Sequence, residues 1–262
     1  MRALYTAATG MAAQELNVQV ISNNIANMRT TGYKKQQAQF QDLIYEHVKR
    51  VGAQASDQGT ILPVGIDIGG GVKTVGTPRL MTQGTLNPTG GDFDLAIRGE
   101  GYFKIQMTDG TFTYTRDGSF TTDGTGRIVT AQGNLVQPTI TVPQNASQIT
   151  INQQGQVSVM LPGSTTPSVI GQISLTRFIN KSGLQSIGDN LFTDTPASGP
   201  PQDGIANADG FGDIQQRNLE QANVEVVSEI SDLIAAQRAY EMNAKVVSAA
   251  DQMMQATTGM FR

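Results

Sequence analysis

The C-terminal stretch of the sequence carries the pattern that most constrains its fold. From Val226, alternating steps of four and three residues reach a mostly apolar series with no Gly or Pro inside it. The series consists of Val226, Ile230, Leu233, Gln237, Tyr240, Ala244, Val247, Asp251 and Met254. Heptad spacing of this kind is typical of coiled coils. We therefore expect a helix of about 45 to 50 Å, too long to be covered by one neighbour in a compact domain.

Both ends of this helix are indicated by local signals. Asn223 stands where an N-cap is expected, and Glu225 and Glu229 place negative charge in the first two turns. Gly259 lies where the helix is expected to have just ended.

A second amphipathic helix is predicted at the N-terminus, over residues 3 to about 27. Its apolar residues at helical spacing include Leu4, Met11, Val18, Ile21 and Ile25. The simplest expectation is that the two terminal helices pack on each other. Such a pair could close the core of a monomer or present a surface for assembly, and the pattern alone leaves both possibilities open.

The end of the N-terminal helix is marked by a cluster of turn-forming residues. Asn23, Asn24 and Asn27 lie within five positions, and Thr31 and Gly32 follow. Asn side chains can accept or donate at freed backbone groups, and glycine adopts positive φ without steric cost. We expect a helix stop with a constrained exit, in which Gly32 takes a positive φ.

The middle of the chain changes from helical to strand periodicity. Residues 38–45 indicate a short helical or extended connector, and the Gly- and Gln-rich stretch from 47 to about 78 predicts an extended arm. Alternation and Asp-Gly turns then predict an antiparallel β domain. Candidate strands cover 93–97, 102–107, 112–115, 119–122, 127–129, 134–136, 140–142, 149–151, 157–161 and 170–178. Residues 180–212 are rich in turn residues and indicate a surface excursion. The predicted fold class is α+β.

No constellation of side chains indicates a reaction. The sequence has no cysteine and a single histidine, His47, so a thiolate or multi-histidine metal site is excluded. Asp92, Asp94, Asp117 and Asp123 could form acid–base pairs, but most of them sit in Gly-rich turns that favour Asp for backbone reasons. We therefore expect no catalytic residues, no metal and no cofactor.

Charge and hydropathy limit the partners and the compartment. A net charge of −4 provides no basic footprint for nucleic acid. No apolar run approaches the length of a transmembrane helix, and the N-terminus lacks the apolar core of a signal peptide. These rules alone would assign the chain to the cytoplasm.

Three separated segments resemble the bacterial flagellar rod and hook proteins. The N-terminal segment is Ser22-Asn23-Asn24-Ile25-Ala26-Asn27 followed by Thr30-Thr31-Gly32-Tyr33-Lys34. The C-terminal segment begins at Asn223 and continues through Ile234-Ala235-Ala236-Gln237-Arg238-Ala239-Tyr240. The central segments, 94–103 and 114–120, are similar to those of the longer family members. Within the family, the length of the chain and the extended stretch at 52–71 are most similar to the distal rod type.

The resemblance implies a subunit of a helical polymer that forms a rigid, hollow shaft and transmits torque to the hook. It implies an inner helical domain of residues 1–30 and 223–262, a connector of residues 31–78 and 212–222 with an extended arm, and an outer β domain of residues 79–211. Implied partners are proximal rod proteins, the hook protein, the surrounding P- and L-ring proteins, the rod cap and the flagellar export apparatus. Export by that route leaves no cleaved signal peptide, which replaces the cytoplasmic assignment with a location in the periplasm-spanning rod.

The resemblance also implies roles for individual residues. Self-assembly would involve the apolar positions of both terminal helices, while Gln237 and Asp251 would set register between helices or face the channel. Asn23, Asn24, Asn27, Thr31, Gly32, Asn223, Gln237, Arg238 and Tyr240 belong to the family motifs. The alternatives within the family are a proximal rod or hook-type protein. Outside it, the alternatives are a secreted β-rich binding module with a coiled-coil stalk and, third, an enzyme.

Overall fold

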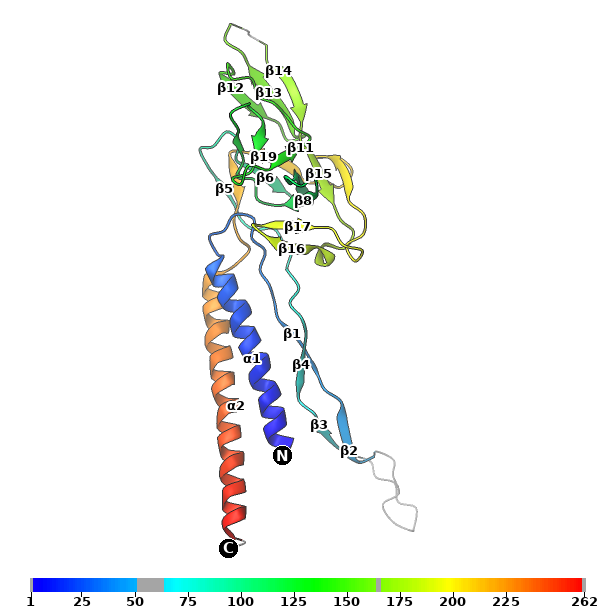
Figure 1. Ribbon diagram of the computed structural model, residues 1–262, viewed down its shortest axis with the longest axis vertical. Helices are drawn as coiled ribbons and strands as arrows, with labels where there is room; N and C mark the ends of the chain where they lie inside the picture. Colours follow the sequence, from blue (N-terminus) through cyan, green and yellow to red (C-terminus); the bar gives the residue numbers. More distant parts are fainter. Residues whose placement is uncertain (1, 51–63, 164–165, 261–262) are drawn as a thin grey trace. The chain divides into compact units, whose positions relative to one another are not determined.

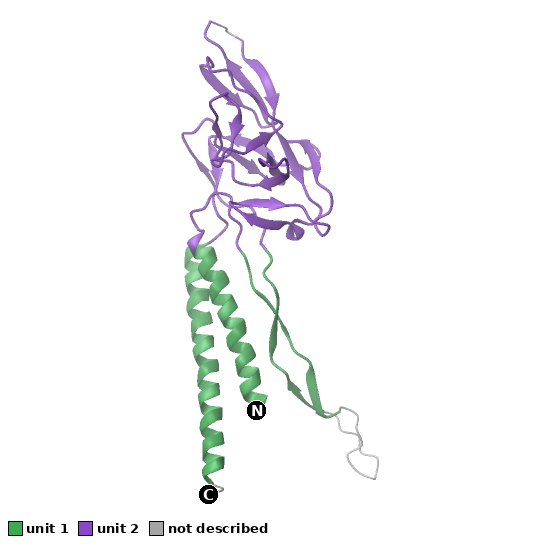
Figure 2. Cartoon of the chain, viewed as in Figure 1, with its two compact units in different colours: residues 1–25, 36–78, 225–262 green, residues 26–35, 79–224 purple. Residues whose placement is uncertain are grey.

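The computed structural model describes residues 2–50, 64–163 and 166–260, which form two compact units (Figures 1 and 2). Unit 1 contains residues 1–25, 36–78 and 225–262, and unit 2 contains residues 26–35 and 79–224. Most of the extended stretch that resembles the distal rod type, residues 52–63, lies outside the described residues.

Unit 1 is built from the two terminal helices and an extended two-stranded arm. Helix α1 spans Arg2–Ala26 and helix α2 spans Val226–Met260, and the two lie side by side in antiparallel orientation (Figure 1). In the arm, β1 (Gln39–Asp42) pairs with β4 (Val72–Gly76), and β2 (Tyr45–Lys49) pairs with β3 (Ile66–Gly69). The connector at 38–45 is therefore extended, one of the two conformations that its sequence left open.

Of the predicted end signals of the C-terminal helix, Glu229 lies in the first turn as expected, but Asn223 and Gly259 were wrong. The helix begins at Val226, so Asn223 does not cap it; its side chain binds the backbone of residues 35, 80 and 82 instead. At the other end the helix continues through Gly259 to Met260. Glycine tolerates helical as well as positive φ, so its presence permits a helix end without requiring one.

Unit 2 is an all-antiparallel assembly of short strands. Its largest sheet has the order β16-β17-β8-β7-β11-β10-β9, with β15 paired to β7 and to β18. A three-stranded sheet β12-β13-β14 and the pairs β19-β6 and β20-β5 complete it. The bounds are β5 Leu86–Pro88, β6 Leu95–Arg98, β7 Tyr102–Gln106, β8 Phe112–Thr115, β9 Thr121–Thr122, β10 Ile128–Val129, β11 Leu135–Gln137, β12 Gln148–Ile151, β13 Gln156–Met160, β14 Ser168–Gln172, β15 Ser174–Arg177, β16 Gln185–Gly188, β17 Leu191–Thr193, β18 Gln202–Ile205, β19 Asp213–Gln216 and β20 Asn218–Glu220, with a 3-10 turn at Lys181–Gly183.

Two apolar clusters hold unit 2 together. The larger one joins side chains of both the main sheet and the three-stranded sheet, among them Phe103, Val157 and Leu175, all fully buried. The smaller one is aromatic, and Tyr114 meets Phe178 edge to face with ring centroids 4.7 Å apart. Unit 2 therefore has a core of its own.

Strand prediction succeeded where alternation was strong and failed where turns dominated. The predicted strand at 170–178 is two strands, β14 and β15, which belong to different sheets. The predicted strand at 140–142 is represented by a single bridge, Arg127 to Thr141. The excursion at 180–212 contains β16, β17 and β18. Strand β16 pairs with its neighbour β17, whereas β17 also pairs with β8 and β18 pairs with β15, both of which lie outside the excursion.

Candidate assembly surface

The register of the helix pair follows from two contacts. Asn24 Nδ2 donates a hydrogen bond to Glu229 Oε2 over 3.1 Å. A Cβ atom added at Gly10 would lie 3.0 Å from Asn243 Nδ2. The two contacts are fourteen residues apart on α1 and fourteen residues apart on α2, in opposite chain directions. The helices thus stay in antiparallel register over two heptads, with small residues such as Gly10 allowing close approach.

In this register, the row of α2 residues that faces α1 differs from the heptad series counted from Val226. The row runs through Glu229, Leu233, Ala236, Tyr240, Asn243, Val247 and Ala250, of which Glu229, Ala236 and Ala250 are buried. Leu233, Tyr240 and Val247 belong to both rows. At the alternate positions the residue that faces α1 lies one position before the residue of the heptad series counted from Val226, which contains Ile230, Gln237 and Ala244.

The remaining apolar residues of unit 1 are largely exposed. Its buried apolar side chains are mostly alanines, whereas large ones on α2 and on the arm face outward. Exposed on α2 are Val226, Val227, Ile230, Ile234, Tyr240, Met242, Val246, Met253 and Met254. Exposed on the arm are Ile44, Tyr45, Val48, Val64, Ile66, Ile68 and Val75. A monomer seldom leaves so much apolar surface on one unit, so this surface is a candidate for contact with other chains.

The predicted assembly residues fall into two groups. On α1, Ile21 is buried, and Leu4, Met11, Val18 and Ile25 are half-buried. On α2, Leu233 and Val247 are half-buried, and Val226, Ile230, Tyr240 and Met254 are exposed. Gln237, Arg238 and Asp251 are exposed as well.

Asn24 is the motif residue that ties unit 1 together. Its amide Nδ2 donates to the carbonyl of Gln36 over 2.8 Å, and its Oδ1 accepts the backbone N–H of Gln36 over 2.9 Å. With the bond to Glu229, one buried side chain joins α1, α2 and the start of the arm. We predicted that the Asn cluster serves the helix end itself; Asn24 instead replaces a strand partner for a residue twelve positions later.

In unit 2 the motif that follows α1 meets a buried carboxylate. Lys34 Nζ lies 2.6 Å from Glu220 Oε1, and Arg116 Nη1 lies 3.1 Å from Glu220 Oε2. The backbone N–H of Gly84 also donates to Glu220 Oε1. Burial lowers the pKa of Lys34, while the Glu220 carboxylate opposes that shift. Sequence reasoning missed this cluster, since nothing in a sequence marks which charges will be enclosed together.

Glycine is needed at position 32, where the backbone passes close to the residues of this charged cluster. Its φ is 68°, as predicted, and its N–H donates to the carbonyl of Glu220 over 2.8 Å. An added Cβ would lie 2.7 Å from the backbone nitrogen of Asp117, closer than real Cβ contacts. The segment 31–34 is thus pressed against the central segment at 116–117.

The other motif residues have smaller roles. The carbonyl of Thr31 accepts a hydrogen bond from Asn190 Nδ2, and Asn27 Oδ1 accepts one from the Thr30 hydroxyl. Asn223 Oδ1 accepts the N–H of Lys35 over 2.7 Å. Asn23 is exposed on α1.

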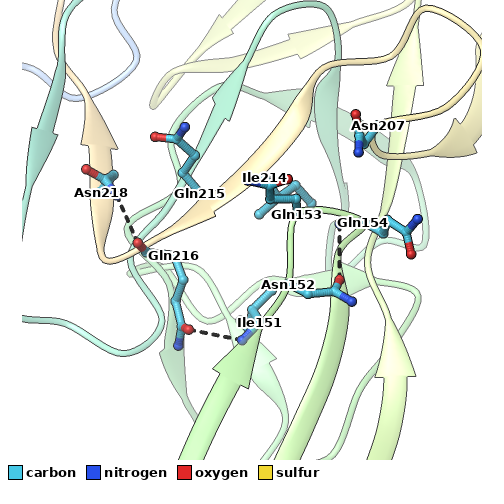
Figure 3. A pocket seen from close by; sticks show the side chains of 9 residues that line it. All are labelled: Ile151, Asn152, Gln153, Gln154, Asn207, Ile214, Gln215, Gln216 and Asn218. Carbon is cyan, nitrogen blue, oxygen red and sulfur yellow. Dashed lines mark hydrogen bonds between the residues drawn. The ribbon is translucent and has the colours of Figure 1, made fainter.

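Unit 2 also has an open cavity of about 650 Å³, lined mainly by amide side chains (Figure 3). Gln216 crosses its wall: its Oε1 accepts the N–H of Ile151, and its Nε2 donates to the carbonyl of Ile149. This amide therefore occupies the hydrogen-bonding edge of β12, which would otherwise invite another strand. The lining contains no ionisable side chain, so it has no acid or base to offer a substrate.

The described part of the chain has neither grouped metal ligands nor a helix that could cross a membrane. Within residues 2–50, 64–163 and 166–260, no three His, Cys, Asp or Glu side chains are grouped to hold a metal ion. His47 Nδ1 instead contacts Asp67 Oδ1 at 2.6 Å in the β2–β3 hairpin. Among the helices that the structure describes, none has a stretch apolar and long enough to span a bilayer.

Comparison with known families matches three parts of the chain. Residues 4–34 match the flagella basal body rod protein family, residues 96–159 the flagellar hook protein FlgE/F/G D1 domain, and residues 215–260 the flagellar basal body rod FlgEFG protein C-terminal family. These regions include most of the helix pair, strands β7 to β11 of the large sheet and the segments around Gly32 and Glu220.

Individual relatives cover nearly the whole chain. The flagellar basal-body rod protein FlgG of Caulobacter vibrioides is 54% identical over 98% of this chain and 98% of its own length. FlgG of Agrobacterium fabrum is 46% identical over 97% of both. The flagellar basal-body rod protein FlgF of Caulobacter vibrioides is 36% identical over 94% of this chain and 91% of its own. The chain therefore belongs to the flagellar basal-body rod protein family.

Proposed function

We propose that this chain is a structural subunit of the distal flagellar rod, which polymerises through unit 1 into a rigid hollow shaft. The observation that carries the proposal is the distribution of apolar surface: unit 2 encloses its large apolar side chains in a core, whereas unit 1 exposes most of its own. Burying one such side chain contributes about 1.5 to 3 kcal/mol. Contacts between copies that repeat head to tail without closing form a helical tube.

The distal position is supported by the comparison within one organism. The chain is 54% identical to FlgG of Caulobacter vibrioides and 36% identical to FlgF of the same bacterium. The role is mechanical rather than enzymatic, in keeping with the family.

The proposed arrangement has an inner wall, a connector and an outer layer. Residues 1–30 and 223–262 would line the channel, residues 79–211 would form the outer layer, and residues 31–78 and 212–222 would connect them. The arm would reach neighbouring subunits and stiffen the shaft. Proximal rod proteins, hook protein, P- and L-ring proteins and the rod cap would be its neighbours after export without a cleaved signal peptide.

The test uses the double variant Ile230→Asp with Leu233→Asp. We expect it to abolish filament formation by purified protein, as seen by electron microscopy, because it places charge on the exposed and half-buried faces of α2. Far-ultraviolet circular dichroism should show the strand signal of unit 2 retained. Ile179→Asp is the matched control, since Ile179 is an exposed isoleucine of unit 2. Normal filaments from the double variant would refute the proposal.

A further inference from the structure

Unit 1 contains an apolar cavity of about 320 Å³ between the start of α1 and the β2–β3 hairpin. Tyr5 contributes to it from α1, and Ile44 and Ile68 contribute from the arm. Tyr5 is 62% exposed and Ile44 is 91% exposed, so these apolar side chains face water within one chain. At roughly 30 Å³ for each water molecule, the cavity holds the volume of about ten waters, room for more than one methionine-sized side chain.

The charges at this cavity cancel each other. Arg2 Nη2 lies 2.7 Å from Glu46 Oε1, and these two residues are the ionisable members of the lining apart from the Tyr5 phenol. The cavity, here named the N-terminal pocket, therefore presents a neutral apolar surface with an ion pair at its edge. It would favour an uncharged apolar occupant.

The far end of α2 is such a segment. The register set by Gly10 with Asn243 and Asn24 with Glu229 places Arg2 opposite Asp251. Residues 252–260 thus extend α2 beyond the start of α1 by about 13 Å at 1.5 Å per residue, as Figure 1 shows. This overhang carries no charged residue, its residues 252–259 are all exposed, and it presents Met253 and Met254 to solvent.

The overhang of one chain cannot fill the pocket of the same chain. Helix α2 is continuous to Met260, so its end projects away along the helix axis rather than folding back towards Tyr5 and Ile44. Both surfaces therefore stay uncovered in a monomer. Each chain carries one of each, and methionine adapts well to irregular apolar cavities.

From these observations we infer that the overhang, residues 252–260, of one copy occupies the N-terminal pocket of a second copy. The inference rests on the proposed polymerisation and names one of its contacts. Because the pocket and the overhang are different surfaces, the contact is heterologous and leaves a free pocket and a free overhang at opposite ends. Successive copies can then be added without closure.

Cysteine cross-linking tests this contact, since the chain has no cysteine of its own. Two variants of the full chain, Met253→Cys and Ile44→Cys, are mixed, assembled into filaments and oxidised with copper phenanthroline. We expect a reducible disulfide-linked dimer that requires both variants. Ile68→Cys in place of Ile44→Cys provides a second pocket position. Met242→Cys with Ile44→Cys is the control, because Met242 is exposed at 61% but lies on the part of α2 alongside α1.

The outcomes separate this inference from the proposed function. Filaments that form without a Met253–Ile44 or Met253–Ile68 cross-link would overturn the inference and leave the polymerising role intact. Equal cross-linking of Met242 would also overturn it, since the contact would then lack specificity. Absence of filaments from the unmodified chain under all conditions would count against the proposed function itself.

Discussion

Lys34 Nζ lies 2.6 Å from Glu220 Oε1, with both side chains fully enclosed although they are 186 residues apart in the chain. The contact joins the segment after the first helix to the strand that precedes the second. Arg116, from the central β segment, binds the other oxygen of the same carboxylate. One buried carboxylate thus links the three parts of the chain that match the flagellar families.

Replacing Glu220 with Gln should strongly destabilise unit 2. The change leaves Lys34 and Arg116 buried without their counter-charge, and breaking a buried ion pair in this way costs about 3 to 5 kcal/mol. Urea unfolding followed by circular dichroism measures the effect. Asp92→Asn is the control, since the Asp92–Arg217 pair is about half exposed and such pairs contribute at most about 1 kcal/mol. A loss below 1 kcal/mol for Glu220→Gln would contradict the assigned role.

Gly32→Ala should destabilise the chain more than Gly110→Ala. Both glycines have positive φ, 68° and 85°, so both variants incur backbone strain on the order of 1 to 3 kcal/mol. A Cβ at Gly110 meets nothing within 4 Å, whereas one at Gly32 would press on the backbone of residues 116 and 117. The difference between the two unfolding free energies measures this contact. Equal losses would show that the close approach does not matter.

Stability should fall as pH rises from 10 to 12, in part through Tyr102. Burial raises the pKa of Tyr102 from 10.0 to about 12. Folding therefore favours the protonated phenol, and its contribution is complete below pH 10 and is lost as pH rises through 12. Two pH units correspond to a limit of about 3 kcal/mol. Tyr102→Phe should flatten the decline measured by urea unfolding at each pH, whereas Tyr240→Phe, at an exposed position, should leave it unchanged.

Before assembly, the backbone of α2 should exchange its amide hydrogens much faster than β7. Only Glu229, Ala236 and Ala250 are buried among the described side chains of α2, whereas three of the five residues of β7 are buried and the strand is paired with β8. Exchange through local opening depends on how much packing is lost when the segment opens. An opening free energy lower by about 3 kcal/mol corresponds to roughly 100-fold faster exchange.

Hydrogen–deuterium exchange with mass spectrometry on monomer and filament checks this expectation. Residues 226–254 should become protected on assembly, while β7 should change little. Protection of α2 in the monomer equal to that of β7 would show that the helix pair is already stable without neighbours.

Local sequence patterns predicted the elements whose signals lie within a few residues. The heptad spacing from Val226 predicted a long C-terminal helix, and the turn chemistry at Gly32 predicted its positive φ, confirmed at 68°. Predictions of the ends of α2 were wrong where the residue type allows more than one conformation or partner. Asn223 does not cap α2, and Gly259 lies inside the helix. Strands β16 to β18 lacked a strong pattern, and β17 and β18 depend on partners outside this stretch.

The two terminal helices, the antiparallel β character of the middle and the resemblance to a family could all be predicted from the sequence, because periodicity and turn residues act locally. Tertiary packing was needed to show that Glu229, Ala236 and Asn243, rather than Ile230, Gln237 and Ala244, face α1. It also decided that Glu220 is enclosed with Lys34 and Arg116. Enclosing a polar or charged side chain is favourable only when its partners arrive with it, and those partners come from segments more than a hundred residues away.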